Sequence, residues 1–191
     1  MRVEIISGSP RAASLTKRVA QHLTKRLSNI PELSVGLIDI RENQWGAVEN
    51  VCQGSRTAPS DRSEIVSRVF YADAFILVTP EYNGSYSPAL KNFIDYFPKQ
   101  NDKVFGIVTA SPGAFGGMRA ALQLQTLIYG LMGIGSPQML IVPGVDSKFL
   151  EDGTLTDEAF TKSVDVFIER FLWLSHAIAY SRATAVIKKC A

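Results

Sequence analysis

The chain has 191 residues, of which 46% are hydrophobic and 20% are charged, and its formal net charge is +2. This length suits one domain that closes a single apolar core without disulfides or metals, so we expect one domain over residues 1–191. The charges are spread along the chain without a basic block, which argues against a nucleic-acid-binding surface.

Signals for export or membrane insertion are missing from the sequence. No apolar run approaches the ~18 residues of a membrane span, and residues 1–6 are too short and too charged for the core of a signal peptide. Cys52 and Cys190 follow no disulfide or metal-ligand pattern. We therefore expect a cytoplasmic protein with no metal site and no membrane partner. His22 and His176 fall in helical patterns and are expected on helix surfaces.

Short runs rich in β-branched residues alternate with longer helical patterns along the chain. This alternation predicts a doubly wound α/β domain, a parallel sheet with helices on both faces. Its ligand should bind outside the carboxyl ends of the strands. Residues 41–60 are predicted to form a loop, and Thr156 is predicted to cap the last helix. Strands are expected over 3–7, 34–40, 74–79, 103–110 and 138–142, and helices over 14–28, 61–71, 88–97, from after 117 to about 132, and 156–180.

The loop after the first strand, residues 9–16, has the composition of an anion site. It leads directly into a helix, whose N-terminal N–H groups and dipole attract negative charge. Arg11 adds a charge-assisted donor, and hydroxyls stand at Ser9, Ser14 and Thr16. The alternative is that Ser14 is simply an N-cap on a structural turn. Neither a Gly-x-Gly-x-x-Gly nor a Gly-Lys-Ser/Thr sequence is present, which argues against dinucleotide and P-loop folds.

Two further loops of unusual composition follow the third and fourth strands. In residues 80–85, Tyr82 offers an aromatic face, Asn83 offers both a donor and an acceptor, and Gly84 permits a tight turn. Residues 111–117 contain three glycines at a strand-to-helix junction, as expected where a backbone approaches a ligand. Either loop alone is compatible with a purely structural turn. Three such loops at one sheet edge favour a ligand site.

Taken together, these motifs resemble the NADPH-dependent FMN reductase family of flavodoxin-like proteins, which includes quinone, chromate and azo-dye reductases. The resemblance rests on Gly-Ser-x-Arg-x-x-Ser at 8–14, Pro-Glu-Tyr-Asn-Gly-Ser at 80–85 and Ser-x-Gly-x-x-Gly-Gly at 111–117. The segment 152–157 also resembles the family. The resemblance implies a flavodoxin-like, five-stranded sheet in the order 2-1-3-4-5, with FMN bound non-covalently.

The resemblance also implies a role for each motif residue. The FMN phosphate would be held by Ser9, Arg11, Ser14 and Thr16, with the Leu15 amide nearby. The isoalloxazine ring would be lined by Pro80, Glu81, Tyr82, Asn83 and Gly84, and on its other edge by Ser111, Gly113, Gly116 and Gly117. Pro10 departs from the family pattern and removes one backbone N–H. Residues 86–89 also depart from it, and this change is expected to reshape access to the flavin.

The implied reaction is hydride transfer from NADPH or NADH through FMN to a small-molecule acceptor such as a quinone, free flavin, azo compound or metal oxyanion. The flavin carries this chemistry, so no catalytic side chain is required. Relatives are commonly dimers or tetramers, which makes Lys91 and Asp95 candidates for subunit contacts, the alternative being an exposed i,i+4 pair. The rival functions are a flavodoxin-type electron carrier and a hydrolase or phosphatase, although no Gly-x-Ser-x-Gly elbow occurs.

Overall fold

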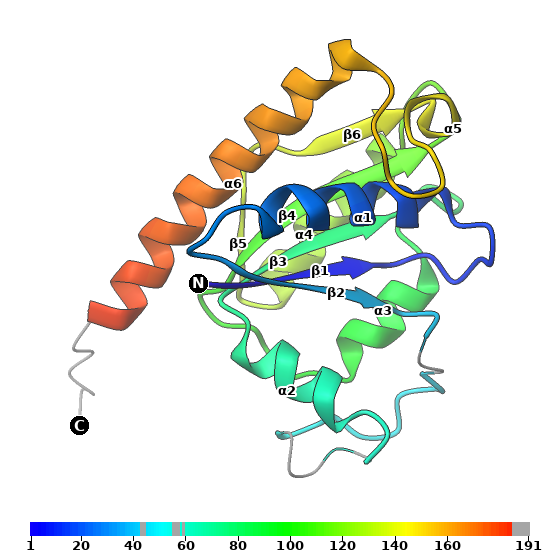
Figure 1. The fold of residues 1–191 in the computed structure, drawn as a ribbon. Helices are drawn as coiled ribbons and strands as arrows, with labels where there is room; N and C mark the ends of the chain where they lie inside the picture. The colour runs from blue at the N-terminus through cyan, green and yellow to red at the C-terminus, as the bar shows by residue number, and fades with distance from the viewer. Residues whose placement is uncertain (43–44, 55–57, 59, 185–191) are drawn as a thin grey trace.

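One parallel sheet organises the computed structural model, which describes residues 1–42, 45–54, 58 and 60–184 (Figure 1). Its first four positions are occupied, in spatial order, by β2 (Ser34–Asp39), β1 (Arg2–Ser7), β3 (Ala74–Thr79) and β4 (Val104–Ser111). Two short strands, β5 (Ile134–Gly135) and β6 (Leu140–Pro143), both pair with the outer edge of β4. The predicted doubly wound α/β class and the order 2-1-3-4-5 are therefore confirmed.

The fifth position of the sheet differs from the prediction of one strand over residues 138–142. Two separate strands share it, and Ser136 and Pro137 lie between them. The backbone N–H of Ser136 still donates to the carbonyl of Phe105, at 2.8 Å. Pro137 has no N–H to donate, which interrupts the ladder after that bond. Pairing with β4 resumes at Leu140.

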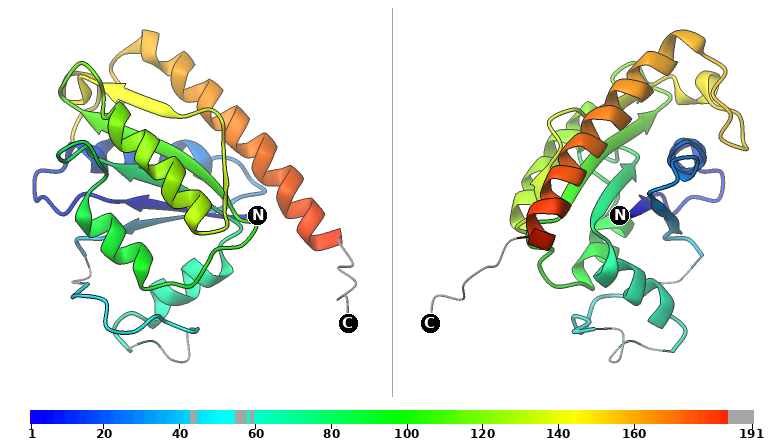
Figure 2. Two further views of the ribbon diagram at one scale, coloured as in Figure 1. Left: turned by 180° about the vertical axis from the view of Figure 1, so that it is seen from behind. Right: turned by 60° about the vertical axis from the view of Figure 1, so that its left-hand side comes forward.

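Helices cover both faces of the sheet (Figure 2). One face carries α1 (Leu15–Ser28) and the long α6 (Glu158–Thr184). The other carries α2 (Ser63–Tyr71), α3 (Pro88–Asp95) and α4 (Met118–Gly130). A short helix, α5 (Val145–Lys148), follows β6.

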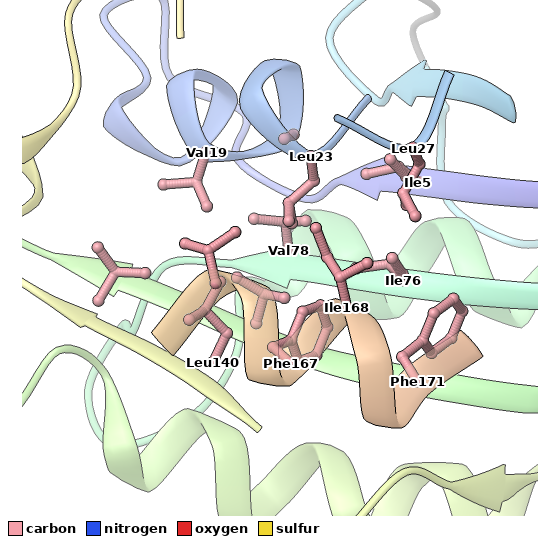
Figure 3. Packing of buried hydrophobic residues seen from close by; sticks show 14 of the residues in the cluster. Ile5, Val19, Leu23, Leu27, Ile76, Val78, Leu140, Phe167, Ile168 and Phe171 are labelled. Atoms are coloured by element: carbon pink, nitrogen blue, oxygen red, sulfur yellow. The ribbon is translucent and has the colours of Figure 1, made fainter. Parts of the chain in front are cut away.

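The central strand β3 is buried along its whole length, because it has helices on both faces. Ile76 and Val78 belong to the apolar cluster shared with α1 and α6. Figure 3 shows these side chains beside Leu23 of α1 and Phe167 of α6. Leu77 belongs to the second cluster, shared with α2, α3 and α4. The side chains of successive residues of β3 thus pack into opposite apolar clusters, as strand geometry requires.

The first and third predicted helices begin as expected, but the predicted cap of the last helix is wrong. Ser14 caps α1, since its Oγ accepts from the Lys17 N–H at 3.1 Å, and Pro88 is in the first turn of α3. At α6, Asp157 replaces Thr156 as the cap: its Oδ1 accepts from the N–H of Phe160 at 3.2 Å. The Thr156 hydroxyl instead donates to the carbonyl of Lys148 at 3.1 Å, which anchors it to α5.

His22 is not the surface residue that its helical pattern suggests. Its Nδ1 lies 3.0 Å from the carbonyl oxygen of Gly153, and its ring packs edge-on against Phe149. Burial lowers the pKa of His22 below its ordinary value. The segment that follows α5 covers this part of α1, a tertiary contact that helical periodicity does not reveal. The expectation for His176 is correct, because it is exposed on α6.

The remaining early expectations concern the loop, the cysteines and the membrane. Residues 45–54 contain no helix or strand, as predicted, and Cys52 is buried there, while 43–44, 55–57 and 59 lie outside the described residues. Cys190 also lies outside them. Across the described segments, no helix combines the length and apolarity needed to cross a bilayer.

Candidate functional site

The three motif loops meet at the carboxyl edge of the sheet. Residues 8–14 follow β1 and residues 80–87 follow β3, while Ser111 ends β4 and residues 112–117 follow it. Parallel pairing aligns the ends of these strands, with Ser7 opposite Val78 and Thr79 opposite Thr109. The arrowheads in Figure 1 point to this shared edge. The topology thus places all the predicted site residues in one region.

The first loop places small and hydroxyl-bearing residues at the N-terminus of α1. Ser9 and Thr16 are each only 2% exposed, whereas Arg11 is exposed. The N–H of Arg11 donates to Ser9 Oγ at 3.4 Å, which curls the loop. The oxygen of Ser14 is used as the helix cap, which leaves its O–H able to donate elsewhere. Leu15 begins α1 directly after this cap.

Asp39 and Arg41, at the end of β2, hold this loop in place through hydrogen bonds and an ion pair. The sequence reasoning missed both residues. Arg41 donates from Nη1 to the carbonyl of Ala12 at 3.2 Å, and its own N–H donates to Asp39 Oδ1 at 3.1 Å. Asp39 is buried and pairs with Lys17 at 2.8 Å, an interaction that raises the pKa of Lys17. The available signal was a carboxylate at the end of an apolar strand, where a buried charge needs a partner.

The second loop contains a tight turn over residues 82–85. The N–H of Tyr82 donates to the Ser85 carbonyl at 2.8 Å, and the reverse bond measures 3.1 Å. Asn83 and Gly84 both have positive φ, 51° and 85°, as in a type I′ turn. Before the turn, Pro80 is half-buried, and its carbonyl accepts from the hydroxyl of Thr79 at 3.1 Å.

Ser87, which the sequence reasoning also missed as a site residue, joins the second loop to the first. Its fully buried hydroxyl donates to the carbonyl of Gly8. The same oxygen accepts from the Leu90 N–H at 3.0 Å, capping α3. The Ser87 N–H donates to Thr79 Oγ1 at 3.1 Å. A serine directly before a proline at a helix start was the available signal.

The third loop approaches its surroundings so closely that two positions tolerate only glycine. Gly116 and Gly117 have φ of 59° and 89°. A Cβ at Gly116 would lie 2.7 Å from Ile141 Cγ2, and one at Gly117 would lie 2.9 Å from Thr109 Cβ. Gly113 has ordinary space, and its N–H donates to Ser111 Oγ at 3.1 Å. The positive φ and close packing account for the Gly-Gly pair.

Side chains also connect the loops to one another and to α4. The guanidinium carbon of Arg11 lies 4.5 Å from the ring centroid of Tyr82, a cation–π contact between the first and second loops. The carboxylate of Glu81 pairs with Arg119, the second residue of α4. Arg119 was not singled out from the sequence, because the pairing depends on how two distant segments pack.

Lys91 and Asp95 form an ion pair within α3. Lys91 Nζ lies 2.5 Å from Asp95 Oδ2, and both side chains are about two-fifths exposed, at 44% and 42%. The pair is thus satisfied inside one chain, and a subunit contact at these residues stays a prediction.

The edge as a whole suits a ligand that combines an anion with a planar polar ring. The first loop supplies hydroxyls, backbone N–H groups and a cation, while the second and third supply an aromatic ring and closely approaching backbone. Among the described residues, no group of three or more His, Cys, Asp or Glu side chains has the arrangement of a metal site.

Comparison with known proteins shows the family of the chain. The family model described as NADPH-dependent FMN reductase matches residues 1–145. A curated FMN-dependent NADPH-azoreductase from Staphylococcus haemolyticus is 27% identical over 181 residues, which cover 90% of this chain and 94% of that protein.

Solved structures show the same fold. The flavoenzyme FerB from Paracoccus denitrificans, an NAD(P)H:(acceptor) oxidoreductase, superposes with a TM-score of 0.76 at 24% identity, covering 92% of this chain and 97% of its own. A flavodoxin variant from Pseudomonas aeruginosa superposes with a TM-score of 0.52 at 20% identity, covering 94% and 97%. Because the family model spans most of its length, the chain belongs to the NADPH-dependent FMN reductase family.

Proposed function

We propose that this chain transfers reducing equivalents from NAD(P)H through FMN to a small-molecule acceptor, with azo compounds as the first class to test. Family membership makes it an NAD(P)H-dependent FMN enzyme. The observation that carries the proposal is the meeting of the three loops. The first two are joined by the Ser87–Gly8 hydrogen bond and the Arg11–Tyr82 contact, and Glu81 of the second pairs with Arg119, directly after the third. The azo class is suggested by the name of the staphylococcal relative.

The polar groups at this edge fit FMN. Three buried hydroxyls have no hydrogen-bond partner within the described chain: that of Ser7 at the end of β1, that of Tyr82 in the loop after β3, and that of Thr109 near the end of β4. Such groups are costly unless a partner satisfies them. FMN offers phosphate, ribityl and ring acceptors over a length that requires more than one loop. These hydroxyls and the exposed Arg11 therefore support FMN as the ligand of this edge.

Bound FMN supplies hydride chemistry between a nicotinamide and an acceptor, and the chain supplies position. Ser9, Arg11, Ser14 and Thr16 would hold the phosphate at the N-terminus of α1, with the Leu15 amide. The ring would be lined by Pro80, Glu81, Tyr82, Asn83 and Gly84, with Ser111, Gly113, Gly116 and Gly117 on its other edge. The fixed turn 82–85 and the Gly116-Gly117 pair keep the backbone donors of both loops in set positions, so binding needs little reorganisation.

Residues at the rim of the site would control which acceptor enters. Phe115, within the glycine-rich loop, is 83% exposed. Residues 86–89 differ from the usual family sequence and lead into α3, which begins at Pro88. Both features are proposed to select planar, partly apolar acceptors, such as azo compounds and quinones, over small oxyanions.

The second candidate is a flavodoxin-type electron carrier, which shares the fold at the TM-score given above. Such carriers are typically strongly acidic, whereas this chain has a net charge of +2. The family model and the curated relative also favour the reductase.

An anaerobic mixing experiment separates the two candidates. The FMN-loaded protein is mixed with NADPH or NADH, and flavin absorbance is followed. Rapid bleaching by either nucleotide supports the reductase, and an unchanged spectrum with both supports the carrier. Steady-state assays with an azo dye, a quinone and free FMN then rank the acceptors. No azo reduction alongside fast quinone reduction would reject the azo assignment alone.

We further propose that residues 1–191 form one FMN-binding domain that works in the cytoplasm as a homodimer or homotetramer. Sedimentation analysis of the FMN-loaded protein tests the assembly. A monomer at micromolar concentration would contradict it.

A further inference from the structure

The carboxylate of Glu81 is held by the first turn of α4. Its Oε1 lies 2.5 Å from Nη2 of Arg119, and its Oε2 accepts a hydrogen bond of 3.2 Å from the backbone N–H of the same residue. The Glu81 side chain is only 11% exposed, whereas that of Arg119 is 74% exposed. One carboxylate thus binds both the main chain and the side chain of one residue.

This contact joins the two loops that flank the proposed ring site. Glu81 belongs to the loop after β3, and Arg119 comes two residues after Gly117, where the loop after β4 ends. A Cβ on Gly117 would lie 3.6 Å from Glu81 Cβ, so the two loops are in close contact. A carboxylate at a helix N-terminus is favourable, and a charge-assisted hydrogen bond is stronger than a neutral one. The pair therefore fixes how far apart the two loops lie.

We infer that Glu81 and Arg119 are positioning residues, which set the spacing of the two ring-side loops and thereby the affinity for the flavin ring. The inference rests on the proposed function, because it takes FMN to lie between these loops. With its carboxylate engaged by α4, Glu81 offers its backbone to the ring. Ion pairs with an exposed member contribute little to global stability, so removing this one should affect cofactor binding more than unfolding.

Arg119→Ala tests the inference, with Arg26→Ala as the matched control. Arg26 pairs with Asp165 at the same distance of 2.5 Å, between α1 and α6, on the face of the sheet opposite α4. FMN affinity is measured by the quenching of flavin fluorescence, and the environment of the bound flavin by visible circular dichroism. We expect Arg119→Ala to raise the Kd for FMN about ten-fold, as for coupled neighbouring groups, and to change the dichroism. Arg26→Ala should leave both unchanged, and the Tm of the two apoproteins should agree.

Glu81→Gln is the second test variant, and its FMN affinity is measured in the same way. Its amide oxygen can still accept from the Arg119 N–H but carries no charge, so its effect should be smaller than that of Arg119→Ala. The double variant should bind FMN no more weakly than Arg119→Ala alone, since both changes remove one interaction. Additive effects would overturn the inference, as would an apoprotein Tm for Arg119→Ala well below that of the control.

The wild-type titration separates this inference from the proposed function. If the wild type and Arg119→Ala bind FMN equally well, the positioning role is rejected and the function stands. If the wild type binds no FMN, both are rejected.

Discussion

The guanidinium of Arg11 lies over the ring of Tyr82, 4.5 Å from its centroid, although 71 positions separate the two residues in the chain. Arg11 is the cation expected at the phosphate, and Tyr82 is the aromatic residue expected beside the flavin ring. The Tyr82 hydroxyl is buried without a partner among the described residues. The Arg11 side chain thus connects the proposed phosphate end of the site with the proposed ring end.

Replacing Arg11 with alanine should weaken FMN binding by about ten- to a hundred-fold, because one charge-assisted hydrogen bond contributes roughly 1.5–3 kcal/mol. Fluorescence titration of the apoprotein with FMN measures this. Arg11→Lys keeps the charge but not the planar guanidinium, so its FMN affinity should lie between those of the wild type and Arg11→Ala. Arg170→Ala, at an exposed position on α6, is the control. Affinity unchanged in Arg11→Ala would place the phosphate elsewhere.

Replacing Ser87 with alanine should destabilise the protein by about 1–3 kcal/mol, because it removes a helix cap and leaves the Gly8 carbonyl without its donor. Urea unfolding of the apoprotein measures the loss, and FMN affinity should fall with it as the first two loops separate. Ser181→Ala, on the exposed surface of α6, should change stability by less than about 0.5 kcal/mol. Wild-type stability in Ser87→Ala would show that the contact contributes nothing.

Gly116→Ala should cost about 1–3 kcal/mol of stability, since an alanine at φ 59° is strained and its Cβ would lie 2.7 Å from the Pro143 nitrogen. Gly113→Ala, in the same loop, meets nothing closer than Ser111 Oγ at 3.5 Å and should be nearly neutral. Thermal unfolding of both variants makes the comparison. Equal stabilities would mean that the loop can relax around an added methyl group.

The stability of the protein should rise with pH above about 8 because of Lys103. Its ammonium is buried and donates to the carbonyls of Val69 and Phe70 at the end of α2, each at 3.0 Å. Desolvation lowers the pKa of Lys103 from 10.5 to about 8. Between these values the unfolded chain binds more protons, so the free energy of unfolding increases with pH, by at most about 3 kcal/mol in total.

Denaturant unfolding of the wild type and Lys103→Met between pH 7 and 10.5 measures this difference. The variant should lack the wild-type rise, and subtracting the two curves cancels the titration of tyrosines and other groups. Parallel curves would show that Lys103 keeps an ordinary pKa in the folded protein.

Periodicity and composition were enough to predict the doubly wound α/β class and the sheet edge where the three motif loops lie, whereas the strand order was predicted from the family resemblance. The apolar run of β3 predicts a central strand, and the polar residues after β1, β3 and β4 mark its carboxyl edge. The family of the chain could also be predicted from the three motifs. The individual contributions of the motif residues stay predictions.

The sequence was less informative wherever a contact joins distant segments. Pairs such as Arg41 with Ala12 and Glu81 with Arg119 depend on how loops pack together, which no local pattern encodes. The cap of α6 was misplaced by one residue, because Thr156 and Asp157 are both good caps and only the contact with α5 decides between them. His22 was misplaced for a similar reason, since the segment that covers it comes from the far end of the chain.

The bond from Ser87 to Gly8 ties the first loop to the fully buried cap of α3, so we expect this loop to open only together with the start of that helix. Ligand-binding loops often unfold locally, well before the rest of a protein, but this one is expected to unfold in the same cooperative unit as the sheet. FMN bound there would then protect the whole domain, by about 2.7 kcal/mol when free FMN stands at a hundred times its Kd. Newly made chains would depend on the supply of flavin for their survival against proteases, and the abundance of the protein in the cell would follow that supply.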